Sequence, residues 1–309
     1  MSSFYFADKI YSAPKNIPGG SLNDQVKLTK STCQVIYDIY DSLCEKYPLY
    51  ASKAELGEVF GLKLNSYSFK NFELENFSEF QPKPYNIVIV TSIHGYEQGC
   101  AWTAAHFFKE MCENTEDEIL RFLKRNVVFE VIPVLNPWGF NHNDRKNGNQ
   151  VDLNRNFHIG FTGEKDVNSE IYPGKNPLSE KETQIVTKFI EENSDAQVVL
   201  DYHNIYGGYP LFYVYGQKDV QLAKSVFSAL TDKWTREYPQ LPKDKILGLV
   251  RPNGNSGMFA DYLLSKGLWV LTMETPWCMP DIGKEQYDQP TIKCALEVLV
   301  NTLYTIVRS

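Results

Sequence analysis

The sequence predicts an α/β protein: a single domain with a mixed, largely parallel central sheet flanked by helices on both faces. Apolar, β-branched runs alternate along the chain with segments of helical spacing, and this alternation is typical of a largely parallel sheet that is covered on both sides. No repeat and no Pro/Gly/Ser-rich linker divides the 309 residues, of which 43% are hydrophobic. We therefore expect residues 1–309 to form one domain, with about 20 N-terminal residues as an extension.

The first half of the chain contains two expected helices and two expected strands. Residues 22–47 have the apolar spacing of an amphipathic helix. Residues 85–92 and 126–136 are β-branched runs that predict buried strands. Residues 98–123, between these strands, have helical spacing and predict a second helix.

The second half begins with a long polar stretch, residues 141–177, which we interpret as an active-site loop because long loops in compact domains are usually functional. The letters SEKE then predict a helix that starts at Ser179, with Ser179 and Glu182 forming a capping box. Residues 196–204 and 267–274 predict two further buried strands, and residues 289–307 predict a closing helix.

Charge and composition argue against several classes of partner. The net charge is −7 without a Lys/Arg cluster, so no nucleic-acid partner is expected. No apolar run is long enough for a transmembrane helix, so no membrane association is expected. The N-terminus lacks the features of a secretory signal, which favours a cytoplasmic location. The six cysteines include no CxxC pair, and we expect them to be free thiols.

Three ionisable residues stand at or just past the ends of predicted strands: His94, His203 and Glu274. Ligands of parallel sheets bind beyond the carboxyl ends of the strands, so these side chains are candidates for one site. His94 and Glu97 form a His-x-x-Glu pair, to which His203 could add the third protein ligand of a catalytic zinc ion. The pair also occurs often by chance, and His203 could be an ordinary buried histidine at a strand end.

Seven motifs together resemble the zinc carboxypeptidase family, the carboxypeptidase A-like metallopeptidases. In chain order they are HGYE, NPWGF, RKN, VDLNRNF, YPGKNPLSEKET, DYHN and TMET. The resemblance covers roughly residues 22–305. It implies a single catalytic domain and a zinc-dependent carboxypeptidase that hydrolyses the C-terminal bond of a peptide with a free C-terminal carboxylate.

The resemblance also implies a role for each residue around the metal. His94, Glu97 and His203 would hold one zinc ion, which activates a water molecule. Asp152 would accept a hydrogen bond from His94 and so fix the orientation of its ring. Glu274 would act first as the general base and then as the general acid.

Other matching residues would contact the substrate. Arg145 would stabilise the oxyanion, and Asn154 and Arg155 would bind the C-terminal carboxylate. Arg251 stands near the position of the family's loop tyrosine, where it could contact an acidic group of the substrate or be a solvated loop residue. Asp261 could place a negative charge in the specificity pocket, which would favour C-terminal Lys or Arg.

The sequence is compatible with two other functions. Zinc deacylases and amidases share the His-x-x-Glu pair and an Asp-Leu-Asn-Arg stretch, so the substrate could be an acylated amino acid or a cell-wall peptide. A cell-wall peptide could also be the substrate of a carboxypeptidase. A non-catalytic binding module would be expected to lack a metal ligand or the base, and this sequence retains all of them: His94, Glu97, His203, Arg145 and Glu274.

Overall fold

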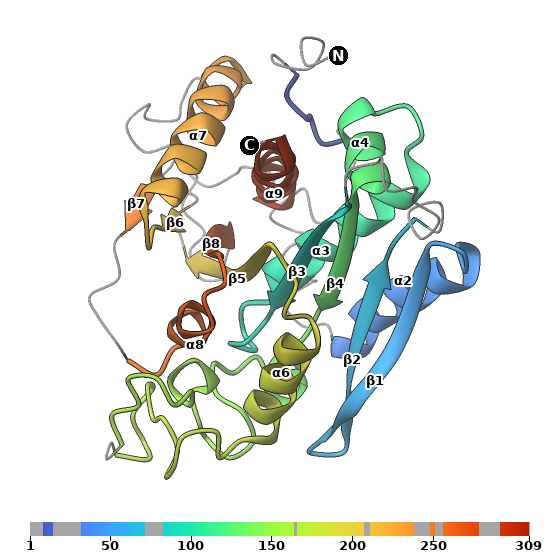
Figure 1. The fold of residues 1–309 in the computed structure, drawn as a ribbon. Coiled ribbons are helices and arrows are strands. Elements are labelled where there is room, and N and C mark those ends of the chain that lie inside the picture. The colour runs from blue at the N-terminus through green and yellow to red at the C-terminus, as the bar shows by residue number, and fades with distance from the viewer. Residues whose placement is uncertain are drawn as a thin grey trace.

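A computed structural model describes residues 9–14, 32–71, 83–163, 166–206, 211–237, 248–250, 256–277 and 291–308. Its centre is an eight-stranded sheet with the order β1-β2-β4-β3-β5-β8-β6-β7 (Figure 1). Four strand pairs are parallel, namely β3 with β4, β3 with β5, β5 with β8 and β6 with β7, and the remaining three are antiparallel. The strands are β1 Ala51–Val59, β2 Leu62–Phe69, β3 Tyr85–Thr91, β4 Val127–Ile132, β5 Val198–Tyr206, β6 Leu211–Tyr213, β7 Gly248–Val250 and β8 Val270–Trp277.

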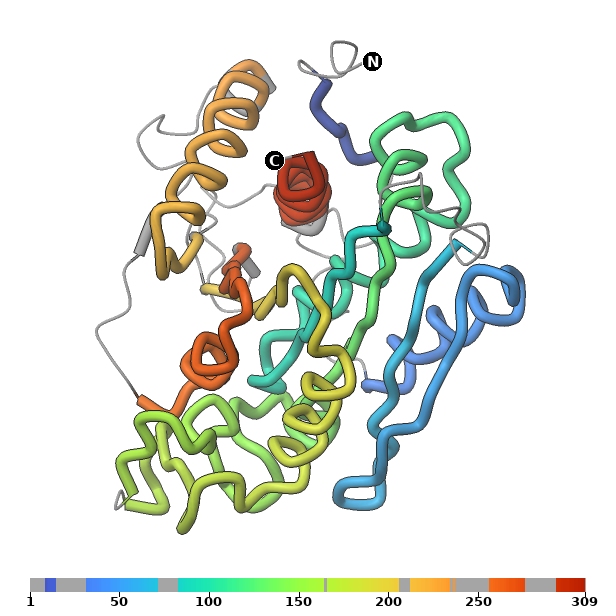
Figure 2. The backbone as a smooth tube through the Cα atoms, viewed as in Figure 1, coloured from blue at the N-terminus to red at the C-terminus, as the bar shows by residue number. Residues whose placement is uncertain are grey.

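Helices cover both faces of this sheet, as expected for the α/β class (Figures 1 and 2). The helices α2, α3, α4, α7 and α9 lie on one face, whereas α6 and α8 lie on the other. They are α2 Cys33–Lys46, α3 Gln98–Glu113, α4 Glu118–Asn126, α5 Pro137–His142, α6 Lys181–Glu192, α7 Gln217–Glu237, α8 Phe259–Ser265 and α9 Thr291–Arg308. The predicted mixed sheet with helices on both faces is therefore confirmed.

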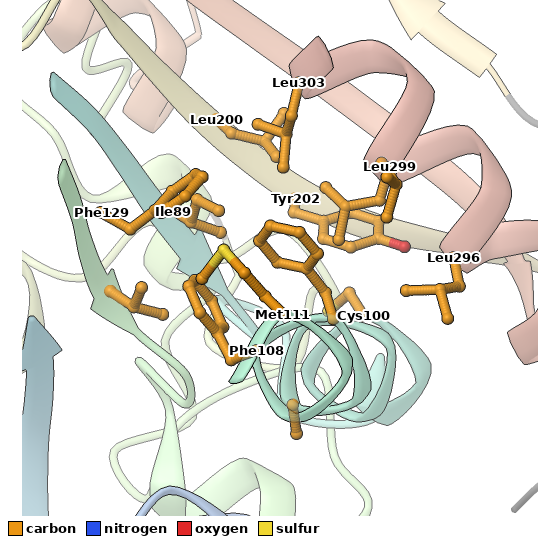
Figure 3. Close-up of a cluster of buried hydrophobic side chains, with 14 of the residues drawn as sticks. Ile89, Cys100, Phe108, Met111, Phe129, Leu200, Tyr202, Leu296, Leu299 and Leu303 are labelled. Atoms are coloured by element: carbon orange, nitrogen blue, oxygen red, sulfur yellow. The ribbon is translucent and has the colours of Figure 1, made fainter. Parts of the chain in front are cut away.

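The two faces of the sheet bury two separate hydrophobic clusters. Successive residues of a strand point to opposite faces, so Ile87 and Ile89 join one cluster while Val88 and Val90 join the other. The larger cluster lies between the sheet and the helices α3 and α9 (Figure 3). Its members in the figure are Ile89, Cys100, Phe108, Met111, Phe129, Leu200, Tyr202, Leu296, Leu299 and Leu303. These contacts fix the central strands, whose ends carry the candidate site.

Two of the expected helices have other bounds in the structure than the sequence predicts. The expected helix over residues 98–123 is two helices, because Asn114 ends α3 and the Asp117 side chain accepts a hydrogen bond from the backbone N–H of Leu120 to start α4. The helix expected from residue 22 is described only from Cys33, where Thr32 has the extended backbone of an N-cap residue. Residues 22–31 of that prediction lie outside the described residues.

The predicted capping box at Ser179 is wrong. The helix α6 begins at Lys181, and its N-cap residue is Glu180, whose side chain makes no capping hydrogen bond. The Ser179 hydroxyl instead donates to Glu180 Oε1 at 2.7 Å and accepts from Asn156 Nδ2 at 3.0 Å. Ser179 therefore ties the preceding loop together instead of starting the helix.

Part of the N-terminal region packs on the closing helix. The backbone N–H of Tyr11 donates to Asn301 Oδ1 and that of Ala13 donates to Glu297 Oε1, both on α9. The division into one domain with an N-terminal extension stays a prediction.

The cysteines among the described residues are free, and Cys278 lies outside those residues. None of the described helices is both long and apolar enough to span a membrane.

The central packing predicts a large difference between two leucine substitutions. Leu200 on β5 is 1% exposed, whereas Leu49 is 76% exposed. Leu200→Ala should lower the free energy of unfolding by about 2–5 kcal/mol, because it leaves a cavity in the core. Leu49→Ala, the matched control, should change it by less than about 0.5 kcal/mol. Urea unfolding followed by tryptophan fluorescence measures both, and equal effects would show that the packing around β5 is not as described.

Candidate active site

Three buried side chains converge at the carboxyl end of β3, where the neighbouring parallel strand β5 continues. The turn after β3 carries His94 and Glu97, and the neighbouring strand β5 carries His203. His94 Nδ1 lies 2.7 Å from Glu97 Oε1, and His203 Nδ1 lies 2.9 Å from Glu97 Oε2. One ligand atom from each residue lies within 4.8 Å of the other two. The structure thus brings together the three residues that the sequence identified as candidate metal ligands.

The chemistry of these atoms fits a metal ion. Burial alone would raise the pKa of Glu97, but the two neighbouring histidines hold it well below its usual range, so the carboxylate is ionised. Two imidazole nitrogens and one carboxylate are a donor set that zinc takes in catalytic sites. All three residues are at most 4% exposed, which leaves little room for solvent to contact them.

Two further carboxylates orient the histidine rings. His203 Nε2 lies 3.0 Å from Asp201 Oδ1, and His94 Nε2 lies 3.3 Å from Asp152 Oδ1. Each ring therefore turns its Nδ1 atom toward Glu97. Asp152 was predicted from the sequence, but Asp201 was missed. The available signal was its spacing, since a residue two positions before His203 on a strand points to the same face.

Glu274 lies next to the metal-ligand candidates. It is on β8 as the Cα partner of His203 on β5, so parallel pairing places the two side chains on the same face of the sheet. The carboxylate remains partly exposed. Burial, and then the negative charge of Glu97, raise the pKa of Glu274 to about 7. Glu274 is thus a carboxyl group beside the cluster that can exchange a proton near neutral pH.

Arg145 approaches the same cluster from the long loop. Its Nε and Nη2 atoms donate to Asp152 Oδ2 at 3.0 and 2.8 Å. Its Nη1 atom lies 3.4 Å from His94 Nδ1 and donates to the Tyr96 hydroxyl at 3.4 Å. A permanent positive charge therefore lies at the edge of the site. Tyr96 was not singled out from the sequence.

Asn154 and Arg155 lie on a short 3-10 helix, η2 Leu153–Arg155, within the long polar loop. Asn154 Oδ1 accepts a hydrogen bond from the backbone N–H of Phe259 at 2.8 Å, and its own backbone N–H donates to Asp152 Oδ1. Arg155 Nη1 donates to the backbone oxygen of Asn154 at 2.6 Å. Both candidate carboxylate-binding residues are therefore linked to the metal-ligand region through Asp152.

Two other sequence candidates do not contribute to the described site. Arg251 lies outside the described residues. Asp261 Oδ2 accepts hydrogen bonds from the backbone N–H groups of Ser256 and Met258 at the start of α8. One oxygen of this carboxylate therefore stabilises the N-terminus of α8, and the charge suggested for the specificity pocket stays a prediction.

The long polar loop between α5 and α6 lies beyond the ends of β3 and β4 (Figure 1). Within it, the buried Asn147 side chain donates to Glu180 Oε2 at 2.8 Å and lies 3.3 Å from Glu182 Oε1. Burial raises the pKa of Glu182 to about 7. Asn147 thus anchors the 145–152 segment, which carries two site residues, to the start of α6.

A family model described as zinc carboxypeptidase matches residues 36–263. The chain belongs to the zinc carboxypeptidase family. Carboxypeptidase A1 of Sus scrofa is 27% identical over 237 residues, which are 68% of this chain and 54% of that protein. Carboxypeptidase A4 of Mus musculus is 28% identical over 204 residues, which are 59% of this chain and 46% of that protein. The chain spans about half the length of these relatives.

Two solved structures have the same fold as this chain. Thrombin activatable fibrinolysis inhibitor aligns with a TM-score of 0.72 and 18% identity, over 93% of this chain and 81% of that one. The carboxypeptidase A of Helicoverpa armigera aligns with a TM-score of 0.68 and 19% identity, over 90% of this chain and 73% of that one. The resemblance to zinc carboxypeptidases that the seven motifs indicated is confirmed.

The Asn147 anchor predicts a pH-dependent difference in stability. The pKa of Glu182 is about 7 in the folded protein, above its ordinary value of 4.5. Between these values the folded state keeps a proton that the unfolded state loses, so ionisation of Glu182 destabilises the fold as the pH rises. The glutamine side chain of Glu182→Gln cannot ionise. The free energy of unfolding of this variant, relative to that of wild type, should therefore increase by up to about 3 kcal/mol from about pH 5 to about pH 8.

Urea unfolding of both proteins across this pH range measures the difference. Glu192→Gln, on the exposed part of the same helix, is the control for a Glu-to-Gln change. If the difference in the free energy of unfolding between Glu182→Gln and wild type stayed constant with pH, burial would not raise the pKa of Glu182 as described.

Proposed function

We propose that this chain is a zinc-dependent metallocarboxypeptidase that hydrolyses the C-terminal peptide bond of its substrate. The observation that carries the proposal is the convergence of His94, Glu97 and His203 in a chain of the zinc carboxypeptidase family. The curated relatives named carboxypeptidase A1 and A4 support the same activity. The proposed partner is a peptide with a free C-terminal carboxylate.

We propose that His94, Glu97 and His203 hold one zinc ion per chain. The metal would supply an activated water molecule and polarise the carbonyl of the scissile bond. Asp152 and Asp201 would keep the two histidine rings in the orientation that directs Nδ1 to the metal.

Glu274 is proposed as the general base and then the general acid. Its pairing with His203 supports this role, because the two side chains lie on the same face of the sheet. It would accept a proton from that water and give a proton to the leaving amine. Burial raises the pKa of Glu274, which favours acceptance of a proton.

Arginine side chains are proposed to bind the negative charges of the reaction. Arg145 Nη1 faces the cluster, where it would donate to the oxygen of the scissile carbonyl as charge develops on it. Arg155 and Asn154 would bind the C-terminal carboxylate of the peptide. The Asn154 oxygen is already occupied by Phe259, so its NH2 group is the part that would donate to a ligand. Arg251 is proposed as an additional substrate contact.

Zinc binding should stabilise the protein through this cluster. Metal-free protein should unfold at a higher temperature when zinc is added. A ligand that binds only the folded state, at about 100 times its dissociation constant, raises the free energy of unfolding by about 2.7 kcal/mol. His203→Ala should abolish this shift because it removes one of the ligands. His158→Ala, which changes an exposed loop histidine, should retain it. Differential scanning calorimetry and metal analysis measure the shift and the stoichiometry, and a full shift in His203→Ala would refute the assignment.

Glu274→Gln should lower hydrolysis by at least about 100-fold without loss of zinc, because glutamine cannot accept the proton. Mass spectrometry of a peptide pool would follow the reaction. The pool varies the last residue, includes free and amidated C-termini, and contains a diaminopimelate-bearing cell-wall tripeptide.

The expected result is loss of single C-terminal residues, blocked by amidation. Cleavage of acylated amino acids alone would favour the deacylase or amidase alternative. Intact substrates in the presence of bound zinc would refute a hydrolase of either class and favour a binding module.

A further inference from the structure

Tyr96 lies in the turn between two of the proposed zinc ligands, and its hydroxyl contacts the arginine of the site. Its ring is nearly parallel to that of His94, with centroids 6.3 Å apart and planes at 22°. Its hydroxyl accepts the Arg145 Nη1 hydrogen bond at 3.4 Å. We propose that Tyr96 is a positioning residue that fixes the direction of Arg145 Nη1 toward the scissile carbonyl. This inference rests on the proposed carboxypeptidase function.

The hydrogen bonds between Arg145 and Asp152 leave one motion of the guanidinium group unrestrained. Both Nε and Nη2 donate to the same atom, Asp152 Oδ2. Two bonds that converge on one oxygen allow the planar guanidinium to swing about that oxygen. Such a swing would displace Nη1, the nitrogen that faces the metal-ligand cluster. A contact with Nη1 itself is needed to stop it.

Among the described residues, Arg145 Nη1 contacts His94 and Tyr96, and metal binding would remove the contact with His94. Nη1 lies 3.4 Å from His94 Nδ1 and 3.4 Å from the Tyr96 hydroxyl. When His94 Nδ1 binds a metal its lone pair is occupied, so it can no longer accept a hydrogen bond from Arg145. The Tyr96 oxygen retains a lone pair for this purpose. It is therefore the contact that holds Nη1 in the loaded enzyme.

The backbone keeps Tyr96 and Arg145 at a fixed separation. The N–H of Tyr96 donates to the backbone oxygen of Asp144, the residue before Arg145, at 2.9 Å. A Cβ atom on Gly95 would lie 2.0 Å from the carbonyl carbon of Gly139, so the metal-binding turn packs directly on the backbone of α5. The phenol and the guanidinium are thus carried by two segments that cannot move independently.

Tyr96→Phe separates the hydroxyl contact from the ring contact, because phenylalanine keeps the ring against His94. The variant should lower kcat by about tenfold and leave KM within about twofold, since the lost interaction acts on the transition state. Zinc affinity, measured by competition with a chelator, and the unfolding temperature should both match wild type. Tyr85→Phe, at the other end of β3, is the control and should match wild type in all measurements.

A double-mutant cycle with Arg145→Lys tests whether the effect passes through the arginine. In the Arg145→Lys background, Tyr96→Phe should change kcat by less than about twofold, because the positioned guanidinium is already gone. Multiplicative effects of the two substitutions on kcat would overturn the inference. A rise in KM at constant kcat would also overturn it, because Tyr96 would then act in substrate binding. A loss of zinc affinity would overturn it as well, because Tyr96 would then support His94.

The same kinetics separate the two proposals. A wild-type protein that binds zinc but cleaves no peptide refutes the carboxypeptidase function, and the role of Tyr96 falls with it. A wild-type protein that is active while Tyr96→Phe has the same kcat refutes the role of Tyr96 alone.

Discussion

The parallel pairing of β3, β5 and β8 is the constraint on which the site depends. The register sets Val90 beside Asp201 and His203 beside Glu274, so the carboxyl ends of the three strands meet at one edge of the sheet. Side chains alternate between faces along a strand, so a slip of one residue would turn Asp201 and His203 to the opposite face. The two hydrophobic clusters oppose such a slip, because it would move the apolar residues of each face to the opposite face and disrupt the packing of both clusters.

The charges gathered at this edge explain why a cation suits it. Glu97, Asp152 and Asp201 are at most 4% exposed, and the carboxyl group of Glu274 is near them. Buried carboxylates are costly unless they are paired. Arg145 neutralises part of this charge through Asp152. A divalent ion bound between the histidines would balance the remaining carboxylates.

The sequence predicted the features that depend on local pattern and missed those that depend on contacts. The strands β3, β4, β5 and β8 were predicted because each is a β-branched apolar run. The β1–β2 hairpin was missed, since β1 is largely exposed and its letters, ASKAELGEV, show no such run. The capping box failed because the Ser179 hydroxyl is engaged by Asn156, a residue distant in sequence. Among the site residues, the ordered motifs indicated the ligands. Asp201 could have been found from its spacing to His203, whereas Tyr96 emerges only from the contacts of its side chain.

Asp152 shows how the separate parts of the site depend on one buried carboxylate. One of its oxygens accepts both bonds from Arg145, and the other accepts the backbone N–H of Asn154 and lies 3.3 Å from His94 Nε2. The side chain is fully buried, so no water can replace a lost contact without rearrangement of the loop. The proposed oxyanion donor and the carboxylate-binding helix therefore share one acceptor, which lies beside the proposed metal ligand His94. Their relative positions are fixed together, which explains how a long polar loop can hold catalytic groups with the accuracy that the proposed reaction requires.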